Sequence, residues 1–389
     1  MRNTMKTSRI IATGFAMFAM LFGAGNVAYP LALGRDIGNQ VLFGLLGFVL
    51  TAVLVPLIGL ISTILADGDY KKILGKLGSL PGNIVILVCM TLIGPFALIP
   101  RCVAISHSAL APYATWLTLP VFSVIAGALI LACIIRSNEV VDLLGKYLGP
   151  LKLILLLSII VVGLFNPLPF VQVGITPCEA FNTGLHTGLG TVDLLGTIFF
   201  AGLIFGSLRR AADDNEELTP RTLMRLGLKA GVIGGLLLGL VYTGFCLVSA
   251  YWGAELVAVA DDSKIFPVIA RLVLGEAGGL LANITLALSC LTTATALSIV
   301  FSEYLHREIL REKIPYLQAQ IITVIVAAIM SNLGFMGIMM FALPIIVLIY
   351  PALIVLAVTH MIYKLWGVDF IKISVASTFA ISLALKYLL

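Results

Sequence analysis

Long apolar runs recur along this chain and are separated by short polar connections. The runs lie at about residues 10–33, 41–66, 83–111, 119–136, 148–166, 188–208, 225–252, 279–302, 316–332, 337–363 and 369–388. About 20 helical residues, at 1.5 Å each, cross the ~30 Å hydrocarbon core of a bilayer. The pattern therefore predicts an all-α polytopic membrane protein, with about eleven transmembrane helices in a single domain over residues 1–389.

The composition fits a protein that uses lipid as its solvent. Hydrophobic residues make up 60% of the 389 residues, charged residues only 11%, and the mean hydropathy is +1.11. Arg2, Lys6 and Arg9 before the first apolar run are also typical of a cleaved signal peptide. We favour a retained span, because the apolar pattern resumes at Val27 and no soluble domain follows it.

Positive charges are unevenly divided between the connections. If the N-terminus is cytoplasmic, most of the 24 Lys and Arg residues fall on the inner side, as the positive-inside rule requires. The exceptions are Arg35, Lys264, Arg271 and Lys386 on the outer side and Arg101 within a span. The net charge of +5 then reflects contact with anionic lipid headgroups, and we expect no nucleic-acid partner.

The chain lacks motifs for nucleotide-driven or cofactor chemistry. Its six cysteines have no metal-ligand spacing, and Gly75-Lys76-Leu77-Gly78 lacks the spacing and the hydroxyl residue of a phosphate loop. We expect no cofactor and no obligate protein partner. If the chain transports a solute, the energy must come from an ion gradient, and one charge moving through 100 mV is worth about 2.3 kcal/mol.

The first apolar run contains residues that weaken a helix. Phe22-Gly23-Ala24-Gly25-Asn26 is followed by Pro30, and glycine and proline cost about 1 and 3 kcal/mol relative to alanine inside a helix. Unpaired backbone groups are tolerated at membrane depth only where they line a cavity or hold a ligand. The pattern predicts a broken first span that binds substrate or ion.

A second interruption is predicted in the sixth span, at Phe199-Phe200-Ala201-Gly202-Leu203-Ile204-Phe205-Gly206-Ser207. Five crossings separate it from the first, so the two halves of the chain would have inverted orientations. Gly202 and Gly206 also form a small-xxx-small pair, for which helix packing is an equally good explanation.

The eighth span carries neighbouring hydroxyl groups in Ser289-Cys290-Leu291-Thr292-Thr293-Ala294-Thr295. The commoner role of a membrane threonine is to bond its own helix carbonyls. The adjacent pair Thr292 and Thr293 also offers two neutral oxygens for a dehydrated Na⁺, with unwound carbonyls of the first span completing its shell.

Three motifs resemble those of a known family. They are Leu21-Phe22-Gly23-Ala24-Gly25-Asn26 with Pro30, Gly94-Pro95-Phe96-Ala97-Leu98-Ile99-Pro100-Arg101, and Cys290-Leu291-Thr292-Thr293-Ala294 with Glu303-Tyr304. Their order and spacing are similar to those of the bacterial branched-chain amino acid:cation symporters, the LIVCS family. The resemblance implies a LeuT-like five-plus-five inverted-repeat fold and Na⁺-coupled uptake of leucine, isoleucine and valine across the inner membrane. We count eleven spans where the family usually has twelve.

On this resemblance, repeat one covers about residues 9–166, repeat two about 188–363, and an extra helix about 369–388. The implied Na⁺ ligands are the carbonyls of Ala19, Phe22 and Ser289 and the hydroxyls of Thr292 and Thr293. The implied substrate site has amides at Gly23, Ala24 and Gly25 for the carboxylate, Asn26 beside the substrate, and carbonyls around Phe199 to Gly202 for the ammonium. Phe199, Phe200 and Phe205 are candidates for the apolar pocket, although each is also explained as an ordinary core or lipid-facing aromatic.

Arg101 is a charge within a span, which costs about 2.5 kcal/mol or more on insertion scales. It should face the protein interior and have a partner, for which Asp193 is the candidate. We favour a structural ion pair between the third and sixth spans over direct contact of Arg101 with substrate.

Other classes of function fit less well. A channel needs a continuous polar file through several spans, whereas the charges here lie almost entirely at the span ends. An intramembrane enzyme needs a nucleophile with a base or a metal motif, and neither His-x-x-x-His nor Gly-x-Ser-x-Gly patterns are present. The alternative within transporters is a proton- or Na⁺-coupled carrier of another small neutral amino acid.

Overall fold

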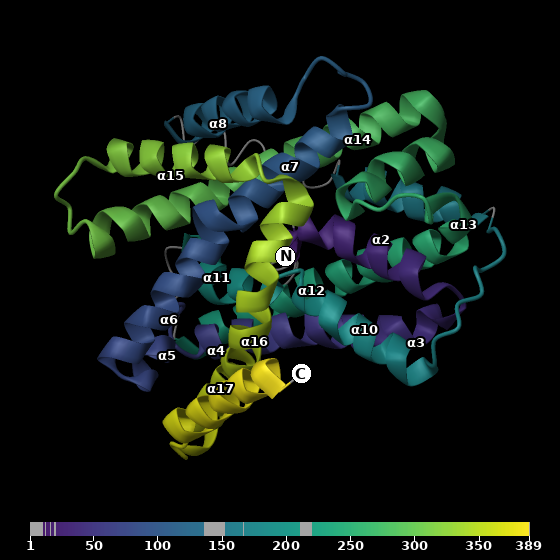
Figure 1. Ribbon diagram of the computed structural model, residues 1–389. Helices are drawn as coiled ribbons and strands as arrows, with labels where there is room; N and C mark the ends of the chain where they lie inside the picture. Colours follow the sequence, from purple (N-terminus) through teal and green to yellow (C-terminus); the bar gives the residue numbers. More distant parts are fainter. Residues whose placement is uncertain are drawn as a thin grey trace, which may run out of the picture.

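The computed structural model describes residues 11–135, 152–165, 167–210 and 220–388, except residues 12, 16, 19 and 20. The side chains of 203–210, 220–224 and 386–388 are also outside the description. Within these ranges the chain is helical and has no strand (Figure 1).

The first half contains five apolar helical segments in chain order. Helical residues up to Leu21 lead into α2 (Gly25–Ile37). The second segment runs unbroken through α3, a π-helical turn and α4, and the third has a π-helical turn between α6 and α7. The bounds are η1 (Gly38–Gln40), α3 (Val41–Val49), η2 (Leu50–Leu54), α4 (Val55–Ile64), α5 (Tyr70–Leu74), η3 (Gly75–Leu77), α6 (Ser79–Thr91), η4 (Leu92–Phe96), α7 (Leu98–Leu110), α8 (Leu119–Ile135) and a helix over Lys152–Phe165.

The second half begins with two helices that follow one another across a short turn. The bounds are α10 (Pro177–Leu189), α11 (Asp193–Arg210), α12 (Pro220–Tyr251), α13 (Gly253–Leu256), η5 (Asp262–Lys264), α14 (Ile265–Tyr304), η6 (Leu305–Ile309), α15 (Tyr316–Ser331), α16 (Gly334–Trp366) and α17 (Ile371–Leu388). α14 is kinked at Gly275, whose φ of 72° lies in the left-handed region that suits glycine.

Five continuous helical stretches of the described chain are long and apolar enough to cross a membrane. They are Gly25–Ile64, Ser79–Leu110, Arg225–Tyr251, Asp262–Ile309 and Gly334–Trp366. Shorter apolar helices cover Leu119–Ile135, Lys152–Phe165, Tyr316–Ser331 and Ile371–Leu385. α10 and α11 follow one another across the turn at Gly190–Val192. The architecture is that of a multi-pass, all-α membrane protein.

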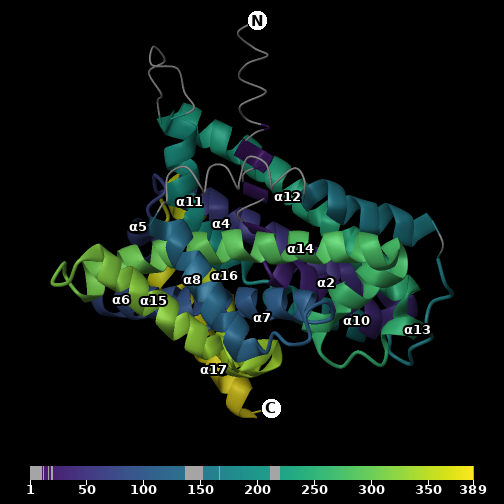
Figure 2. The same ribbon diagram turned by 90° about the horizontal axis from the view of Figure 1, so that it is seen from above.

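The two halves pack on each other reciprocally. α2 of the first half packs on α12 of the second, while α10 and α11 of the second pack on α3 and α4 of the first. α7 and α14, the third helices of the two halves, pack on one another (Figures 1 and 2). The first broken helix of each half therefore lies against the second helix of the other half, as an inverted repeat requires.

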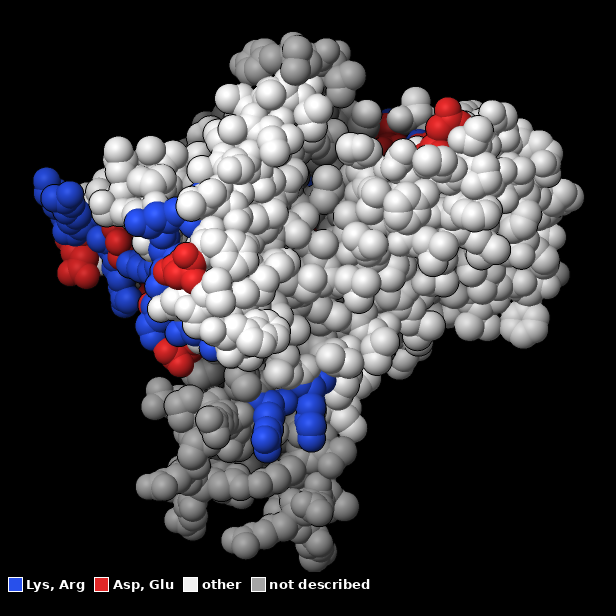
Figure 3. Space-filling view, turned by 90° about the horizontal axis from the view of Figure 1, so that it is seen from below, with Lys and Arg blue, Asp and Glu red and all other residues white. Residues whose placement is uncertain are grey.

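Charged side chains gather at the ends of the molecule. In Figure 3 most of the Lys, Arg, Asp and Glu residues lie toward one end, a few lie at the other, and the broad surface between them carries none. Around α5 the ion pairs are Lys71–Glu308 at 2.5 Å and Lys72–Asp67 at 2.5 Å. Near α13, at the opposite end in Figure 2, Arg35 pairs with Asp262 at 2.9 Å and donates to the Val259 carbonyl at 2.6 Å. The uncharged band matches a hydrocarbon layer.

Candidate functional site

The first span is interrupted where the sequence predicts. The amide of Phe22 makes the last helical bond of the first segment, to the Phe18 carbonyl at 2.8 Å. Phe22, Gly23 and Ala24 are not helical, and α2 begins at Gly25. Among the described residues, the amides of Gly25 and Asn26 have no backbone acceptor. The start of α2 thus presents unpaired donors and the positive end of a helix dipole inside the protein.

Asn26 holds this interruption in place. The Gly23 amide donates to Asn26 Oδ1 at 2.9 Å, so the side chain closes the turn on its own backbone. Its Nδ2 donates to both carboxylate oxygens of Asp193 at 2.8 Å and also contacts the Tyr242 hydroxyl. The Tyr242 hydroxyl donates to Asp193 Oδ2 at 2.7 Å. All three side chains are almost fully buried, so this network links α2, α11 and α12 away from water.

A second interruption lies at Gly190, Thr191 and Val192, between α10 and α11. Val192 has φ of 64°, an uncommon left-handed conformation for a β-branched residue, and such strain persists only where surrounding contacts enforce it. Tyr350 of α16 accepts the Leu194 amide at 2.9 Å and so caps the start of α11. The two interruptions meet, because Asp193 in the first turn of α11 is bonded to Asn26.

Arg101 of α7 contacts both interruptions. Its Nη1 donates to the Gly190 carbonyl at 2.8 Å and its Nη2 to the Thr191 carbonyl at 3.2 Å. A Cβ on Gly25 would lie 2.6 Å from Arg101 Nη2, so only glycine lets α2 approach the guanidinium this closely. Arg101 Nε is buried and has no hydrogen-bond partner in the described structure. One donor of a buried guanidinium is therefore left for a ligand.

A small cavity lies where these elements converge. Its lining combines the polar residues Asn26, Arg101 and Asp193 and residues of both interruptions with apolar side chains. Its lining is Leu21, Gly23, Ala24, Asn26, Leu98, Arg101, Cys102, Thr191, Val192, Asp193, Gly196, Phe200, Thr293 and Leu297. A cavity lined by one basic residue, one acidic residue and apolar side chains suits a zwitterion with a hydrocarbon side chain.

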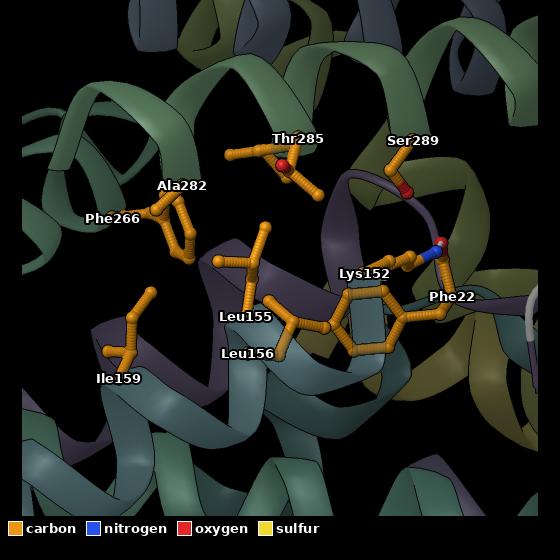
Figure 4. A pocket seen from close by; sticks show the side chains of 10 residues that line it. Phe22, Lys152, Leu155, Leu156, Ile159, Phe266, Ala282, Thr285 and Ser289 are labelled. Atoms are coloured by element: carbon orange, nitrogen blue, oxygen red, sulfur yellow. Dashed lines mark hydrogen bonds between the residues drawn. The ribbon is translucent and has the colours of Figure 1, made fainter. Parts of the chain in front are cut away.

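The predicted ion ligands lie around the first interruption, with Thr293 lining the cavity and Phe22 and Ser289 lining a second pocket. The hydroxyls of Thr292 and Thr293 both donate to the Ser289 carbonyl, at 2.7 and 3.1 Å. The Lys152 ammonium donates to the Phe22 carbonyl at 2.5 Å. Figure 4 shows Lys152 reaching this carbonyl from the Lys152–Phe165 helix, with the Ser289 hydroxyl above it on α14. A lysine cation thus occupies the carbonyl for which the sequence suggests Na⁺.

Comparison with known proteins identifies the family. The model of a family described as branched-chain amino acid transport protein matches residues 6–387. This chain belongs to that family. The branched-chain amino acid permease BraB of Bacillus subtilis is 29% identical, over 94% of this chain and 82% of the relative. The branched-chain amino acid transport system 3 carrier protein of Pseudomonas aeruginosa is 30% identical, over 94% and 83%.

Solved structures agree with the LeuT-like fold of this branched-chain amino acid transporter. The inward-facing conformation of Mhp1 matches with a TM-score of 0.67 and 15% identity, covering 97% of this chain and 85% of Mhp1. A Na⁺-coupled sialic acid symporter matches with a TM-score of 0.58 and 12% identity, covering 96% and 90%. Both the family and the fold expected from the sequence are confirmed.

Several residues implied by the resemblance meet in the transporter's cavity. Those that line it are Gly23, Ala24, Asn26, Phe200 and Thr293, together with Arg101 and Asp193. Gly25 lies beside it against Arg101. Ala19 lies outside the described residues, as does the side chain of Phe205. What these residues bind stays a prediction.

The predicted position of the second interruption is wrong. α11 is helical from Asp193 to Arg210, straight through Phe199–Ser207, and the chain breaks earlier, at Gly190–Val192. Phe199 packs on Tyr70 with ring centroids 4.8 Å apart, away from the cavity. A Cβ on Gly202 would lie 3.2 Å from the Gly68 carbonyl. This contact fits the alternative explanation of Gly202, which is close packing.

The predicted ion pair between Arg101 and Asp193 is also wrong as a direct contact. The two residues share no salt bridge or hydrogen bond, because the Arg101 donors bond the Gly190 and Thr191 carbonyls and the Asp193 carboxylate is taken by Asn26 and Tyr242. Arg101 still connects the third span to the sixth, through backbone rather than through the acid.

Two important residues were not singled out from the sequence. Tyr242 carries no local signal, since a tyrosine in an apolar span is usually a core residue. Lys152 was counted with the positive charges at the inner end of a span, where lysines commonly extend to the interface. The second interruption did have a signal, because Gly188-Leu189-Gly190 precedes Thr191 and an acidic first-turn residue, a common helix start.

Proposed function

We propose that this membrane transporter imports leucine, isoleucine and valine by cation symport with alternating access. The observation that supports it best is the junction of two broken helices at Asn26 and Asp193, beside a cavity lined by both polar and apolar residues. Family membership supports the substrate class, since the relatives are named as branched-chain amino acid permeases.

In this proposal the substrate ammonium faces Asp193 and the substrate carboxylate faces Arg101 and the start of α2. Asp193 is a buried anion, and Arg101 retains an unpartnered Nε. The unpaired amides and positive dipole end of α2 favour a carboxylate. The branched side chain would then lie against Phe200, Val192 and Leu297.

The uneven distribution of Lys and Arg residues between the two ends supports uptake across a bacterial inner membrane. The ion-paired cluster around α5 faces the cytoplasm in this proposal, as does the N-terminus, because most Lys and Arg residues fall on that side. We propose no enzymatic activity for the chain. The resemblance to the symporter family implies Na⁺ as the coupling ion, and H⁺ is the alternative.

Uptake into proteoliposomes tests this function. Leucine, isoleucine and valine should each accumulate against a gradient when a cation gradient is imposed, and each should compete with the others. Asp193→Asn should lower uptake at least about tenfold, while the exposed control Asp369→Asn should not. Preferential transport of alanine or serine over leucine would support the alternative of a carrier for another small neutral amino acid.

A further inference from the structure

The carbonyls expected to bind Na⁺ are already engaged. The Phe22 carbonyl accepts from Lys152 Nζ at 2.5 Å, and the Ser289 carbonyl accepts from the hydroxyls of Thr292 and Thr293. A metal ion at this point needs several oxygens free of other cations. The two hydroxyls instead satisfy their own helix, which is the commoner role of membrane threonines.

Lys152 is buried and held at the interruption. Only 4% of the residue is exposed, and Nζ lies 4.5 Å from the ring centroid of Phe22 and 5.7 Å from that of Phe18. An ammonium at membrane depth needs a partner, and an unwound backbone carbonyl is the one it has. The contact also fills the acceptor that the interruption of the helix leaves free.

The Lys152 ammonium has no carboxylate partner among the described residues. Within the described part of the chain no Asp or Glu lies within 4.0 Å of Lys152, and its ionisable neighbours are the thiols of Cys102 on α7 and Cys290 on α14. The Ser289 hydroxyl lines a pocket with Lys152, is buried, and has no hydrogen-bond partner among the described residues. A Na⁺ ion on the Phe22 carbonyl would lie directly beside the positive charge of Lys152, and no carboxylate of the described residues lies close enough to offset their repulsion.

The predicted Na⁺ ligands therefore do not fit Na⁺ in this chain. We propose that the Lys152 ammonium is a tethered cation that takes the place of Na⁺ at the first interruption, so that the transporter binds its substrate without sodium. The absence of a Na⁺ site can be tested without any substrate. The effect of Lys152 on leucine binding rests on the proposed function. It assigns Lys152 a positioning role: its charge fixes the Phe22 carbonyl and hence the turn at Gly23.

Sodium binding by the purified protein in lipid nanodiscs tests the proposal without any substrate. Radioactive sodium is added at constant ionic strength, with choline as the balancing cation. The wild-type protein should show no saturable sodium binding. Saturable binding that the double substitution Thr292→Ala and Thr293→Ala removes would overturn the proposal.

Leucine binding provides a second test, with matched variants. The wild-type affinity should agree within about twofold in sodium and in choline. Lys152→Met, which removes the charge at similar length, should weaken leucine binding at least about tenfold in both salts. The leucine affinity of Lys152→Arg should lie closer to that of wild type. The exposed control Lys229→Met should have the wild-type affinity. Wild-type affinity in Lys152→Met would overturn the positioning role.

The two tests separate failure of the proposal from failure of the function. If the wild-type protein binds no branched-chain amino acid in either salt, the proposed function is wrong, while the sodium measurement still decides whether Lys152 replaces the ion. If Lys152→Met does not fold, the sodium measurement and the salt dependence of wild-type leucine binding decide the question without it.

Discussion

Asn26 Nδ2 donates to both carboxylate oxygens of Asp193 at 2.8 Å, which joins the two interrupted helices of this transporter through a single amide. The Oδ1 atom of the same Asn26 side chain accepts a hydrogen bond from the backbone N–H of Gly23 at 2.9 Å. The shape of the first interruption and the position of Asp193 are therefore coupled. A movement of α11 relative to α2 must either carry the turn at Gly23 with it or break these bonds.

Asn26→Asp should disable transport. The substitution replaces the donor to Asp193 with a second carboxylate, and two buried like charges repel strongly. Leucine uptake should fall at least about tenfold, more than in Asn26→Ala. Asn332→Ala is the matched control, since Asn332 is exposed and caps only its own helix. Undiminished uptake in Asn26→Asp would show that the bond to Asp193 is dispensable.

Arg101→Lys should weaken leucine binding although it keeps the charge. The guanidinium bonds two successive carbonyls from separate nitrogens, and a single ammonium cannot reproduce that fork. We expect a loss of affinity of about tenfold, measured by equilibrium binding in detergent or nanodiscs. The exposed Arg307→Lys should be neutral. Equal affinities in the two variants would mean that only the charge of Arg101 matters.

Gly25→Ala should destabilise the protein by overpacking. The added methyl group would lie 2.6 Å from Arg101 Nη2, so the guanidinium must move away from the Gly190 carbonyl. Overpacking of this kind costs about 1–3 kcal/mol, which should lower the melting temperature of the purified protein. Gly75→Ala is the control, because its added methyl group meets nothing within 4 Å. If Gly25→Ala melts like Gly75→Ala, the close approach of α2 to Arg101 is incorrect.

Thr292→Val should leave transport nearly unchanged. Its hydroxyl bonds the Ser289 carbonyl of its own helix, and a bond of this kind adds little to helix stability. Uptake should stay within about twofold of wild type at every sodium concentration. A fall in uptake that high sodium restores would instead place the Thr292 hydroxyl in an ion site, as the sequence suggests.

Local sequence signals explain which parts of the fold were predictable. The spans follow from hydropathy because lipid requires long apolar helices, and the first interruption follows from Gly23, Gly25 and Pro30 within one of them. Gly202 gives no such signal, since glycine at a packing contact and glycine at a break look alike in sequence. The break at Gly190 falls between α10 and α11, at the start of the apolar run over 188–208, where hydropathy predicts an uninterrupted span.

The contacts that define the site join residues far apart in the chain. Asn26 and Asp193 are separated by 167 residues and Lys152 and Phe22 by 130, so neither pair has a local signature. Arg101 and Asp193 are charged residues within predicted spans, so each was expected to be buried with a partner. The partners of Arg101 are backbone carbonyls, and those of Asp193 are neutral side chains. Residue type predicted that partners must exist, and only the fold shows which atoms provide them.

The contacts of Arg35 bear on how α2 can move during transport. Its guanidinium joins the end of α2 to Val259 and Asp262, in the segment between α12 and α14. In the proposed transport cycle, separation of α2 from this segment would require Arg35 to exchange both contacts for water. Arg35 lies near one end of α2, and Gly25 and Asn26 at the other end belong to the proposed substrate site, so movement of this segment and substrate binding would involve the same helix.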